Sequence, residues 1–131
     1  MDRQEMVEAS NALSKRIIGA AIEVHRQFGP GPLESAYEAC LCRELELREI
    51  SFQAQVPIPL EYKGIRVGCG FKIDILVENL VIIELKSVEK IELRHELQLS
   101  TYLKITGLWL GLLINFNEPT IKAGLHRVVN G

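Results

Sequence analysis

The chain has 131 residues, of which 47% are hydrophobic and 24% are charged, and its formal net charge is −2. This size and composition predict one globular domain over residues 1–131 with a single hydrophobic core. The longest uncharged stretch, residues 105–117, is interrupted by Gly107 and Gly111 and is shorter than the ~20 apolar residues of a membrane-spanning helix. The acidic balance argues against a general nucleic-acid binder but is compatible with a local basic rim around an acidic site.

The first ten residues, MDRQEMVEAS, are too polar for a secretory signal, so we expect an intracellular, cytoplasmic protein with no membrane partner. The three cysteines, Cys40, Cys42 and Cys69, show no CxxC spacing. This pattern favours buried reduced thiols over a metal site.

Two helices are predicted at the start of the chain. Asn11 or Ser10 is the expected N-cap of the first, whose apolar residues recur at three- and four-residue spacing as far as Phe28. The sequence GPGP at 29–32 ends this helix and begins a second one over about 33–48. Its expected buried side comprises Leu33, Tyr37, Cys40, Leu41, Leu45 and Leu47. Glu34 falls in the first turn, three and four residues before Tyr37 and Glu38.

A β region is predicted next. Residues 55–62, QVPIPLEY, contain two prolines that cannot donate ladder hydrogen bonds, which predicts an edge strand or the lead-in to one. After a turn at Lys63–Gly64, a long alternation from Ile65 to Val77 predicts one strand with Ile73 and Ile75 on its apolar face. Asp74 is expected on the opposite face.

The remaining elements complete an α/β pattern. After a reversal at Glu78–Asn79, residues 81–86 form an apolar run typical of a strand buried on both faces. A third helix contains Leu93, Leu97, Leu99 and Leu103 and is expected to end at Gly107. Two further strands are predicted over 109–116 and 125–129.

The buried strand ends in two charges. Because successive side chains of a strand alternate between faces, Glu84 and Lys86 share one face and Leu85 lies on the other. A plain structural interpretation is a salt bridge at the end of a strand. The functional interpretation needs Asp74 beside Glu84, since carboxylates bind a hard cation such as Mg²⁺ and a lysine can orient a water or contact phosphate oxygens. This set of groups is suited to metal-assisted phosphodiester cleavage.

The hairpin register decides whether Asp74 reaches Glu84. With a two-residue loop at Glu78–Asn79, Asp74 would lie opposite Ile83 and point away from Glu84. A three-residue loop that includes Leu80, or one bulge, would bring Asp74 opposite Glu84.

These segments resemble a known family. FKIDILVENLVIIELKS, residues 71–87, resembles the core motif of the PD-(D/E)XK nuclease superfamily. GPLESAYEACL, residues 31–41, is similar to the signature of the GxxExxY family within it, with Gly31, Glu34 and Tyr37 at the defining positions. Further similar segments are AAIEVHRQFGPG before this signature, HELQLSTYLKITG after the ExK strand, and GLLINF near the end.

The resemblance implies a restriction-endonuclease-like αβββαβ core with an additional N-terminal helix. It also implies that Glu34, Asp74 and Glu84 hold Mg²⁺ or Mn²⁺ and that Lys86 is the catalytic lysine. Ile73 stands where the superfamily name has a proline, at a position that varies widely in the superfamily.

Other residues are expected at the edge of the site. The family pattern includes Gln98 and Tyr102, which lie four residues apart on a helical face with His95. We place Gln98 among the catalytic residues, although it could instead be a hydrogen-bonded partner of the sheet. Tyr102, His95, Tyr37 and His25 are candidates for substrate contact, against core or helix-end roles. A phosphate-binding rim could be formed by Lys63, Arg66, Lys72, Lys90, Arg94 and Lys104.

We therefore expect a Mg²⁺-dependent phosphodiesterase that hydrolyses nucleic acid, either DNA or RNA. The main alternative is a noncatalytic scaffold domain that binds nucleic acid or protein and keeps the nuclease fold. Another metal-dependent enzyme on the same scaffold is a third interpretation. A chain of this size makes a small substrate footprint, which is compatible with a homodimer.

Overall fold

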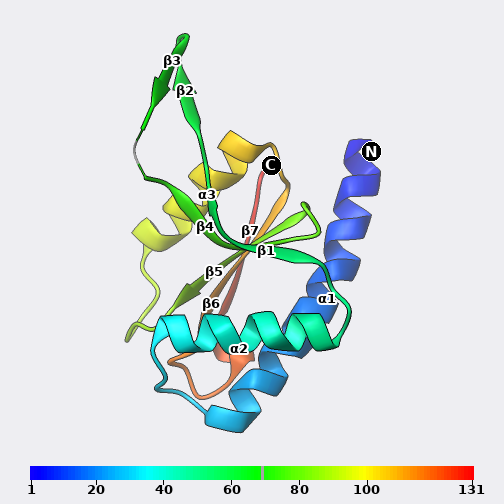
Figure 1. The fold of residues 1–131 in the computed structure, drawn as a ribbon, viewed down its shortest axis with the longest axis vertical. Coiled ribbons are helices and arrows are strands. Elements are labelled where there is room, and N and C mark those ends of the chain that lie inside the picture. The colour runs from blue at the N-terminus through cyan, green and yellow to red at the C-terminus, as the bar shows by residue number, and fades with distance from the viewer. Residues whose placement is uncertain (69) are drawn as a thin grey trace.

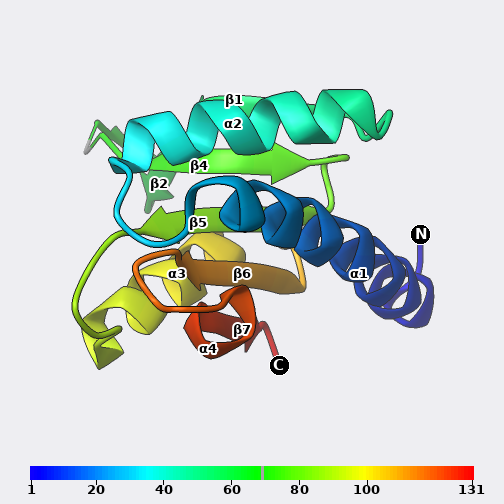
Figure 2. The ribbon, with the colours of Figure 1, turned by 90° about the horizontal axis from the view of Figure 1, so that it is seen from below.

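A mixed five-stranded sheet lies between helices on its two faces, as Figures 1 and 2 show for the computed structural model, which describes residues 1–68 and 70–131. The predicted thiol of Cys69 lies outside the described residues, whereas Cys40 and Cys42 are free and partly buried. In chain order the elements are α1 (Arg3–Phe28), α2 (Glu34–Leu47), β1 (Phe52–Pro57), β2 (Leu60–Tyr62), β3 (Ile65–Val67), β4 (Lys72–Val77), β5 (Val81–Lys86), α3 (Leu93–Thr106), β6 (Leu110–Asn115), α4 (Ile121–Gly124) and β7 (Leu125–Val129).

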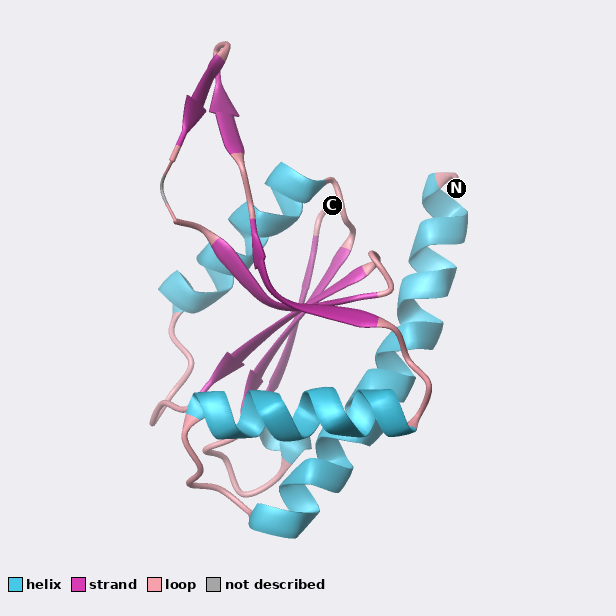
Figure 3. Cartoon of the chain, in the orientation of Figure 1, coloured by secondary structure: helices cyan, strands magenta, loops and turns pink. Residues whose placement is uncertain are grey.

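The strands are ordered β1-β4-β5-β6-β7. Among the strand pairs of residues 1–68 and 70–131, only β5–β6 is parallel, because α3 carries the chain back between these two strands. Strand β1 lies at an edge of the sheet and ends at Pro57, so the edge position predicted for residues 55–62 is confirmed for the first part of this segment. Its last part belongs to β2. Strands β2 and β3 form a separate hairpin that projects from the body of the molecule (Figure 3).

Two apolar clusters hold the helices on the sheet. The larger cluster joins α1 and α2 to one face through residues such as Ile17, Leu41 and Leu112. The smaller cluster joins α3 to the other face through Leu99 and Leu113. Strand β5 is buried on both faces, as predicted, because Ile83 belongs to the first cluster and Ile82 to the second.

The first helix begins much earlier than predicted. Asp2, not Asn11 or Ser10, is the N-cap of α1: its side chain accepts a hydrogen bond from the backbone N–H of Glu5, and the Glu5 side chain accepts one from the Asp2 N–H. This reciprocal capping box stabilises a helix start at Arg3. Ser10 is buried inside the helix.

The buried faces of α2 and α3 are narrower than predicted. Leu33 is 76% exposed because it is the extended N-cap of α2, and Leu47 is 60% exposed because it lies two residues beyond the buried position of Leu45. In α3 the expected apolar residues Leu93 and Leu97 are likewise exposed. Two residues correspond to about 200° around a helix, so a residue two positions from a buried one points outward.

The single strand predicted from Ile65 to Val77 is wrong. It divides into β3, which pairs only with β2, and β4, which joins the main sheet. The predicted face is also wrong for Ile73, which packs in the α3 cluster although Ile75 packs in the α1 and α2 cluster. The alternation changes phase beside Gln55 of the neighbouring strand, whose φ of 53° is left-handed.

The short helix α4 was not predicted, and it begins at a Thr120 cap whose hydroxyl accepts a hydrogen bond from Ala123 N–H. None of the helices in the described part of the chain combines the length and the apolar character that crossing a bilayer requires.

Candidate metal and hydrolytic site

The β4–β5 turn has the three-residue loop that brings Asp74 to Glu84. Val77 pairs with Val81, so Glu78, Asn79 and Leu80 lie between the strands, and the Leu80 N–H donates to the Val77 carbonyl at 2.9 Å. Glu78 and Asn79 both take left-handed φ values, 50° and 51°. These values are those of a tight hairpin turn with one extra residue, so this version of the register prediction is confirmed.

Carboxylates replace the backbone ladder at the next step. The paired residues of β4 and β5 run from Val77–Val81 to Ile75–Ile83. One step further, the Asp74 N–H donates to Oε1 of Glu84 at 3.2 Å, and the Leu85 N–H donates to Oδ2 of Asp74 at 2.8 Å. The start of β4 and the end of β5 therefore form a fork that is closed by two acidic side chains.

Burial and charge act together on Glu84. Its side chain is 5% exposed in a region where Asp74 is its nearest acidic neighbour. Burial, then the charge of Asp74, raise the pKa of Glu84 to about 8, although the Asp74 N–H and the Lys86 charge act in the opposite direction. At neutral pH the pair therefore holds a proton, and a hydrogen bond joins its two side chains.

Lys86 lies on the same strand as Glu84 but forms no close ion pair with it. Among the ion pairs formed by the described residues, none joins Lys86 to Glu84. The lysine is half-buried at the end of β5, and its positive charge still lowers the pKa of Glu84. The simple strand-end salt bridge is therefore not formed in this structure.

A cavity of about 440 Å³ opens beside Asp74. It is lined by Glu34, Ser35, Glu38, Gln55, Asp74 and Leu85. The first turn of α2 supplies Glu34, whose Oε1 accepts a hydrogen bond from the Ser87 N–H at 3.0 Å. Glu34 thus lines the same cavity as Asp74 and contacts the segment that follows Lys86.

Glu38 is a member of this cavity that the sequence analysis did not assign to the site. Gln55 donates to its carboxylate at 2.8 Å. Burial, and then the negative charge of Asp74, raise the pKa of Glu38, while the Gln55 hydrogen bond opposes the shift. The available signal was its spacing of four residues from Glu34, which puts both side chains on one face of α2.

Asn115 holds the chain that leaves β5. It is 1% exposed, and it lies on β6 directly beside Lys86 in the parallel register. Its Oδ1 accepts from the Val88 N–H at 3.1 Å and its Nδ2 donates to the Val88 carbonyl at 2.8 Å. Val88 is therefore anchored through both its N–H and its carbonyl, next to the Ser87 N–H that meets Glu34. The sequence analysis included Asn115 only as part of the segment GLLINF.

Two residues expected at the site edge have structural contacts elsewhere. The Tyr37 ring is fully buried, stacks on Phe116 with 4.2 Å between ring centroids, and donates its hydroxyl hydrogen to the Ala21 carbonyl at 3.0 Å. Burial raises the pKa of this phenol. A ring nitrogen of His25 lies 2.9 Å from the Glu118 carbonyl oxygen, so His25 joins the end of α1 to the loop before α4.

Helix α3 carries the other three candidates in different environments. Nδ1 of His95 accepts from the Glu92 N–H at 2.9 Å as part of the N-terminal cap of the helix. Tyr102 is buried in the α3 cluster, and its ring centroid lies 5.7 Å from that of Phe71. Gln98 is exposed on the same helix. His95 and Tyr102 are thus buried in α3, whereas Gln98 is accessible at its surface.

The donor set suits a hard cation, but its members are not gathered around one point. Within the described residues, no three His, Cys, Asp or Glu side chains form a group that could hold a metal ion. Asp74 and Glu84 are in contact, and Glu34 lines the cavity beside Asp74. Carboxylate oxygens are the ligands that Mg²⁺ prefers, so the residues fit such an ion in their chemistry.

Comparison with known proteins gives one match. A family model described as the PD-(D/E)XK nuclease superfamily matches residues 11–128. The matched region includes Glu34, Asp74, Glu84 and Lys86. Searches of curated proteins and of solved structures returned no match.

Proposed function

Because the chain belongs to the PD-(D/E)XK nuclease superfamily, we propose that it is a divalent-metal-dependent nuclease that hydrolyses phosphodiester bonds of DNA or RNA. The observation that carries the proposal is the fork between β4 and β5 beside an acidic cavity, where the Glu84 carboxylate accepts from the Asp74 N–H and the Asp74 carboxylate accepts from the Leu85 N–H. A buried carboxylate pair of this kind stabilises the fold poorly, which favours a role in binding a cation. Gly31, Glu34 and Tyr37 support the finer assignment to the GxxExxY family.

In this proposal Glu34, Asp74 and Glu84 hold Mg²⁺ or Mn²⁺, the kind of ion that nucleases of this superfamily generally use. The bound ion would acidify a water and offset the charge of the scissile phosphate. Glu38 lies in the same cavity wall and keeps Gln55 oriented. The cation also makes an acidic cavity accessible to a polyanion, which the carboxylates alone would repel.

Lys86 orients the attacking water and contacts the phosphate oxygens as negative charge develops on them. Its freedom from a close ion pair with Glu84 supports this role, because the ammonium remains available. Gln98, exposed on α3, contacts the substrate at the edge of the site. Ser87 and Val88 are fixed by Glu34 and Asn115, which limits the positions that the neighbouring Lys86 can take.

A noncatalytic scaffold is the second candidate, and one observation favours it. The three proposed ligands do not form one metal-binding group within the described residues. Under this alternative, the domain binds nucleic acid or protein through its surface, and the fork has no part in binding.

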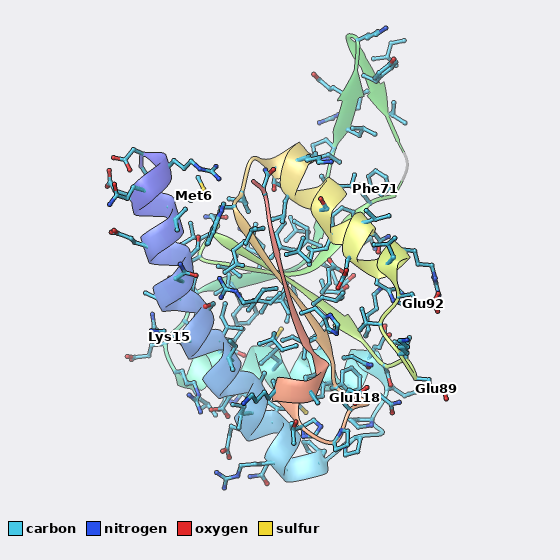
Figure 4. The ribbon with its side chains drawn as sticks, turned by 180° about the vertical axis from the view of Figure 1, so that it is seen from behind. Met6, Lys15, Phe71, Glu89, Glu92 and Glu118 are labelled. Carbon is cyan, nitrogen blue, oxygen red and sulfur yellow. The ribbon has the colours of Figure 1, made fainter. Side chains whose placement is uncertain are left out.

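A cleavage assay separates the two functions. Wild type, Asp74→Asn and Lys86→Ala are incubated with single- and double-stranded DNA and RNA in Mg²⁺, Mn²⁺ or EDTA. Lys15→Ala is the control, since this exposed lysine lies on α1, away from Phe71 and the base of the hairpin (Figure 4). We expect metal-dependent cleavage by wild type and the control, and a loss of about 100-fold or more in the other two variants.

The opposite pattern supports the scaffold. Folded wild-type protein that cleaves none of the substrates in any metal, and that binds a partner equally well after Asp74→Asn or Lys86→Ala, would contradict the nuclease proposal.

A further inference from the structure

The β2–β3 hairpin extends away from the apolar core. Within the part of the chain that the structure describes, its strands pair only with each other and are joined by the turn at Lys63 and Gly64. Figure 1 shows the hairpin projecting beyond the sheet and the helices. Tyr62 and Ile65, which are paired across the hairpin, are 62% and 68% exposed. Residues so exposed add little to the stability of the fold, so the hairpin needs another explanation.

Positive charge is concentrated in this part of the chain. Residues 57–72 contain Lys63, Arg66 and Lys72 but one acidic residue, Glu61, which gives +2 in a chain whose net charge is −2. The rest of the chain therefore carries −4. All four of these charged side chains are exposed, and Nζ of Lys63 lies 5.3 Å from the centroid of the Tyr62 ring. The hairpin, with Lys63, Arg66 and Glu61, together with Lys72 at its base, thus forms a basic arm with an aromatic ring near its tip.

The arm is attached directly beside the proposed site. It leaves β1 after Pro57 and returns at Lys72, the first residue of β4, two residues before Asp74. At ~3.3 Å per residue of strand, Lys72 and Asp74 are only about 7 Å apart along the backbone. The ring of Phe71, at the base of the arm, contacts Tyr102 of α3, as the position of Phe71 beside this helix in Figure 4 illustrates. A ligand that lies along the arm as far as its base would therefore reach the start of β4.

We propose that the β2–β3 hairpin is an arm that grips duplex DNA next to the carboxylate fork. This inference rests on the proposed function for the class of ligand and adds the form of the substrate and the surface that holds it. A two-stranded ribbon fits the major groove of B-form DNA, whereas the major groove of duplex RNA is too narrow for it. Lys63 and Arg66 contact phosphates or guanine edges, and Tyr62 and Ile65 contact the apolar parts of the groove.

The arm can be altered without disturbing the core. We compare Lys63→Glu/Arg66→Glu with Lys15→Glu/Arg16→Glu, which makes the same change in net charge on the exposed side of α1. Lys86→Ala is added to each protein so that bound DNA stays intact. The probes are fluorescently labelled duplex DNA about three helical turns long, the corresponding single strand, and duplex RNA, each titrated at several salt concentrations.

We expect the arm variant to bind duplex DNA about tenfold or more weakly than the Lys86→Ala parent and to lower the salt-dependence slope by about two. The control variant keeps the affinity of the parent. Duplex DNA is preferred over the single strand and over duplex RNA. Equal binding by the arm and control variants, or a preference for either of the other probes, overturns the inference.

The assay also distinguishes this inference from the proposed nuclease activity. Proteins that retain Lys86 are compared with and without the arm substitutions at low and high substrate concentrations. If they cleave DNA equally well, the proposed nuclease activity is supported and the proposed role of the arm is contradicted. If DNA binding depends on the arm but no metal supports cleavage, the role of the arm in binding is supported and the proposed nuclease activity is contradicted. A wild-type dimer that Ile65→Glu dissociates, with DNA binding unchanged by Lys63→Glu/Arg66→Glu, shows that the hairpin joins two copies of the chain and overturns the inference.

Discussion

At Glu84 the physical requirements of folding and of metal binding conflict. Folding favours the neutral acid, because the carboxyl group is buried next to Asp74. A bound cation would favour the charged form, because its positive charge is placed against the carboxylates. The free energy of unfolding of the metal-free protein should therefore depend on pH, because ionisation of Glu84 destabilises the folded state.

The first prediction concerns Glu84→Gln. The pKa of Glu84 rises from the model-peptide value of 4.5 to about 8 on folding. Between these values the folded protein holds more protons than the unfolded chain, so its free energy of unfolding falls as the pH rises through this window. We expect the metal-free wild type to lose stability between pH 5 and pH 8, on the order of a few kcal/mol, and Glu84→Gln to flatten most of this dependence.

Urea unfolding in EDTA at several pH values measures this effect. Glu78→Gln is the matched control, because Glu78 is exposed in the β4–β5 turn, away from the fork. A pH dependence in Glu84→Gln as steep as in wild type would show that Glu84 is not the residue that loses its proton.

A second prediction tests whether Tyr37 stabilises the fold or takes part in catalysis. Tyr37→Phe keeps the ring stack on Phe116 but removes the hydrogen bond to the Ala21 carbonyl, so we expect a loss of about 1 kcal/mol in the free energy of unfolding. Cleavage per folded molecule should stay at the wild-type level. A variant with normal stability and no cleavage would instead place the hydroxyl in the catalytic site.

Residue patterns singled out some of the residues that the structure brings together beside the cavity and missed others. Glu84, Asp74 and Glu34 are charged residues at strand positions or at the start of a helix, where a charge needs a structural or functional reason. They could therefore be singled out in the sequence. Glu38 was not singled out, because glutamates are common on exposed helix faces and only the approach of Gln55 and Asp74 distinguishes this one. His95 accepts a hydrogen bond from the backbone N–H of Glu92 in the helix cap, a role that becomes visible only once the start of α3 is known.

At the scale of elements, the hairpin turn between β4 and β5 determines the site. One extra residue, Leu80, changes which face Asp74 occupies. The sequence could state the two registers but not choose between them, since Glu78 and Asn79 are compatible with both loops. The long alternation from Ile65 was misleading for a related reason: a strand pattern does not say which partner the strand pairs with.

The third prediction concerns the segment after β5. Asn115→Ala removes both hydrogen bonds to Val88, so the chain that positions Lys86 and the Ser87 N–H becomes less constrained. We expect kcat to fall about 100-fold with KM little changed, because small displacements of a catalytic group are costly.

Steady-state cleavage kinetics test this prediction against Asn117→Ala. Asn117 also donates to the Val88 carbonyl, at 3.2 Å, but it is exposed and its side chain makes no bond to the Val88 N–H. An equal fall in kcat in the two variants, or a rise in KM alone for Asn115→Ala, would contradict the role of Asn115 in positioning Lys86.

At the scale of the whole molecule, the chain has the restriction-endonuclease-like fold with an additional N-terminal helix. The order of the longer helices and of the strands of the main sheet could be predicted because their apolar patterns are clear, and α1 and α3 end at the glycines Gly29 and Gly107. The projection of β2 and β3 from the sheet could not, since it depends on pairing across space. The assembly of Glu34 from α2 with Asp74 from β4 likewise depends on how α2 packs on the sheet.

The central claim is that the fork between β4 and β5 binds a divalent cation. The most direct test is calorimetric titration of Mn²⁺ into metal-free wild type, Asp74→Asn and the control Glu61→Gln, whose exposed side chain lies on the projecting hairpin. We predict saturable binding by wild type and Glu61→Gln and its loss in Asp74→Asn. Binding that is unchanged in Asp74→Asn, or absent from wild type, would contradict the claim.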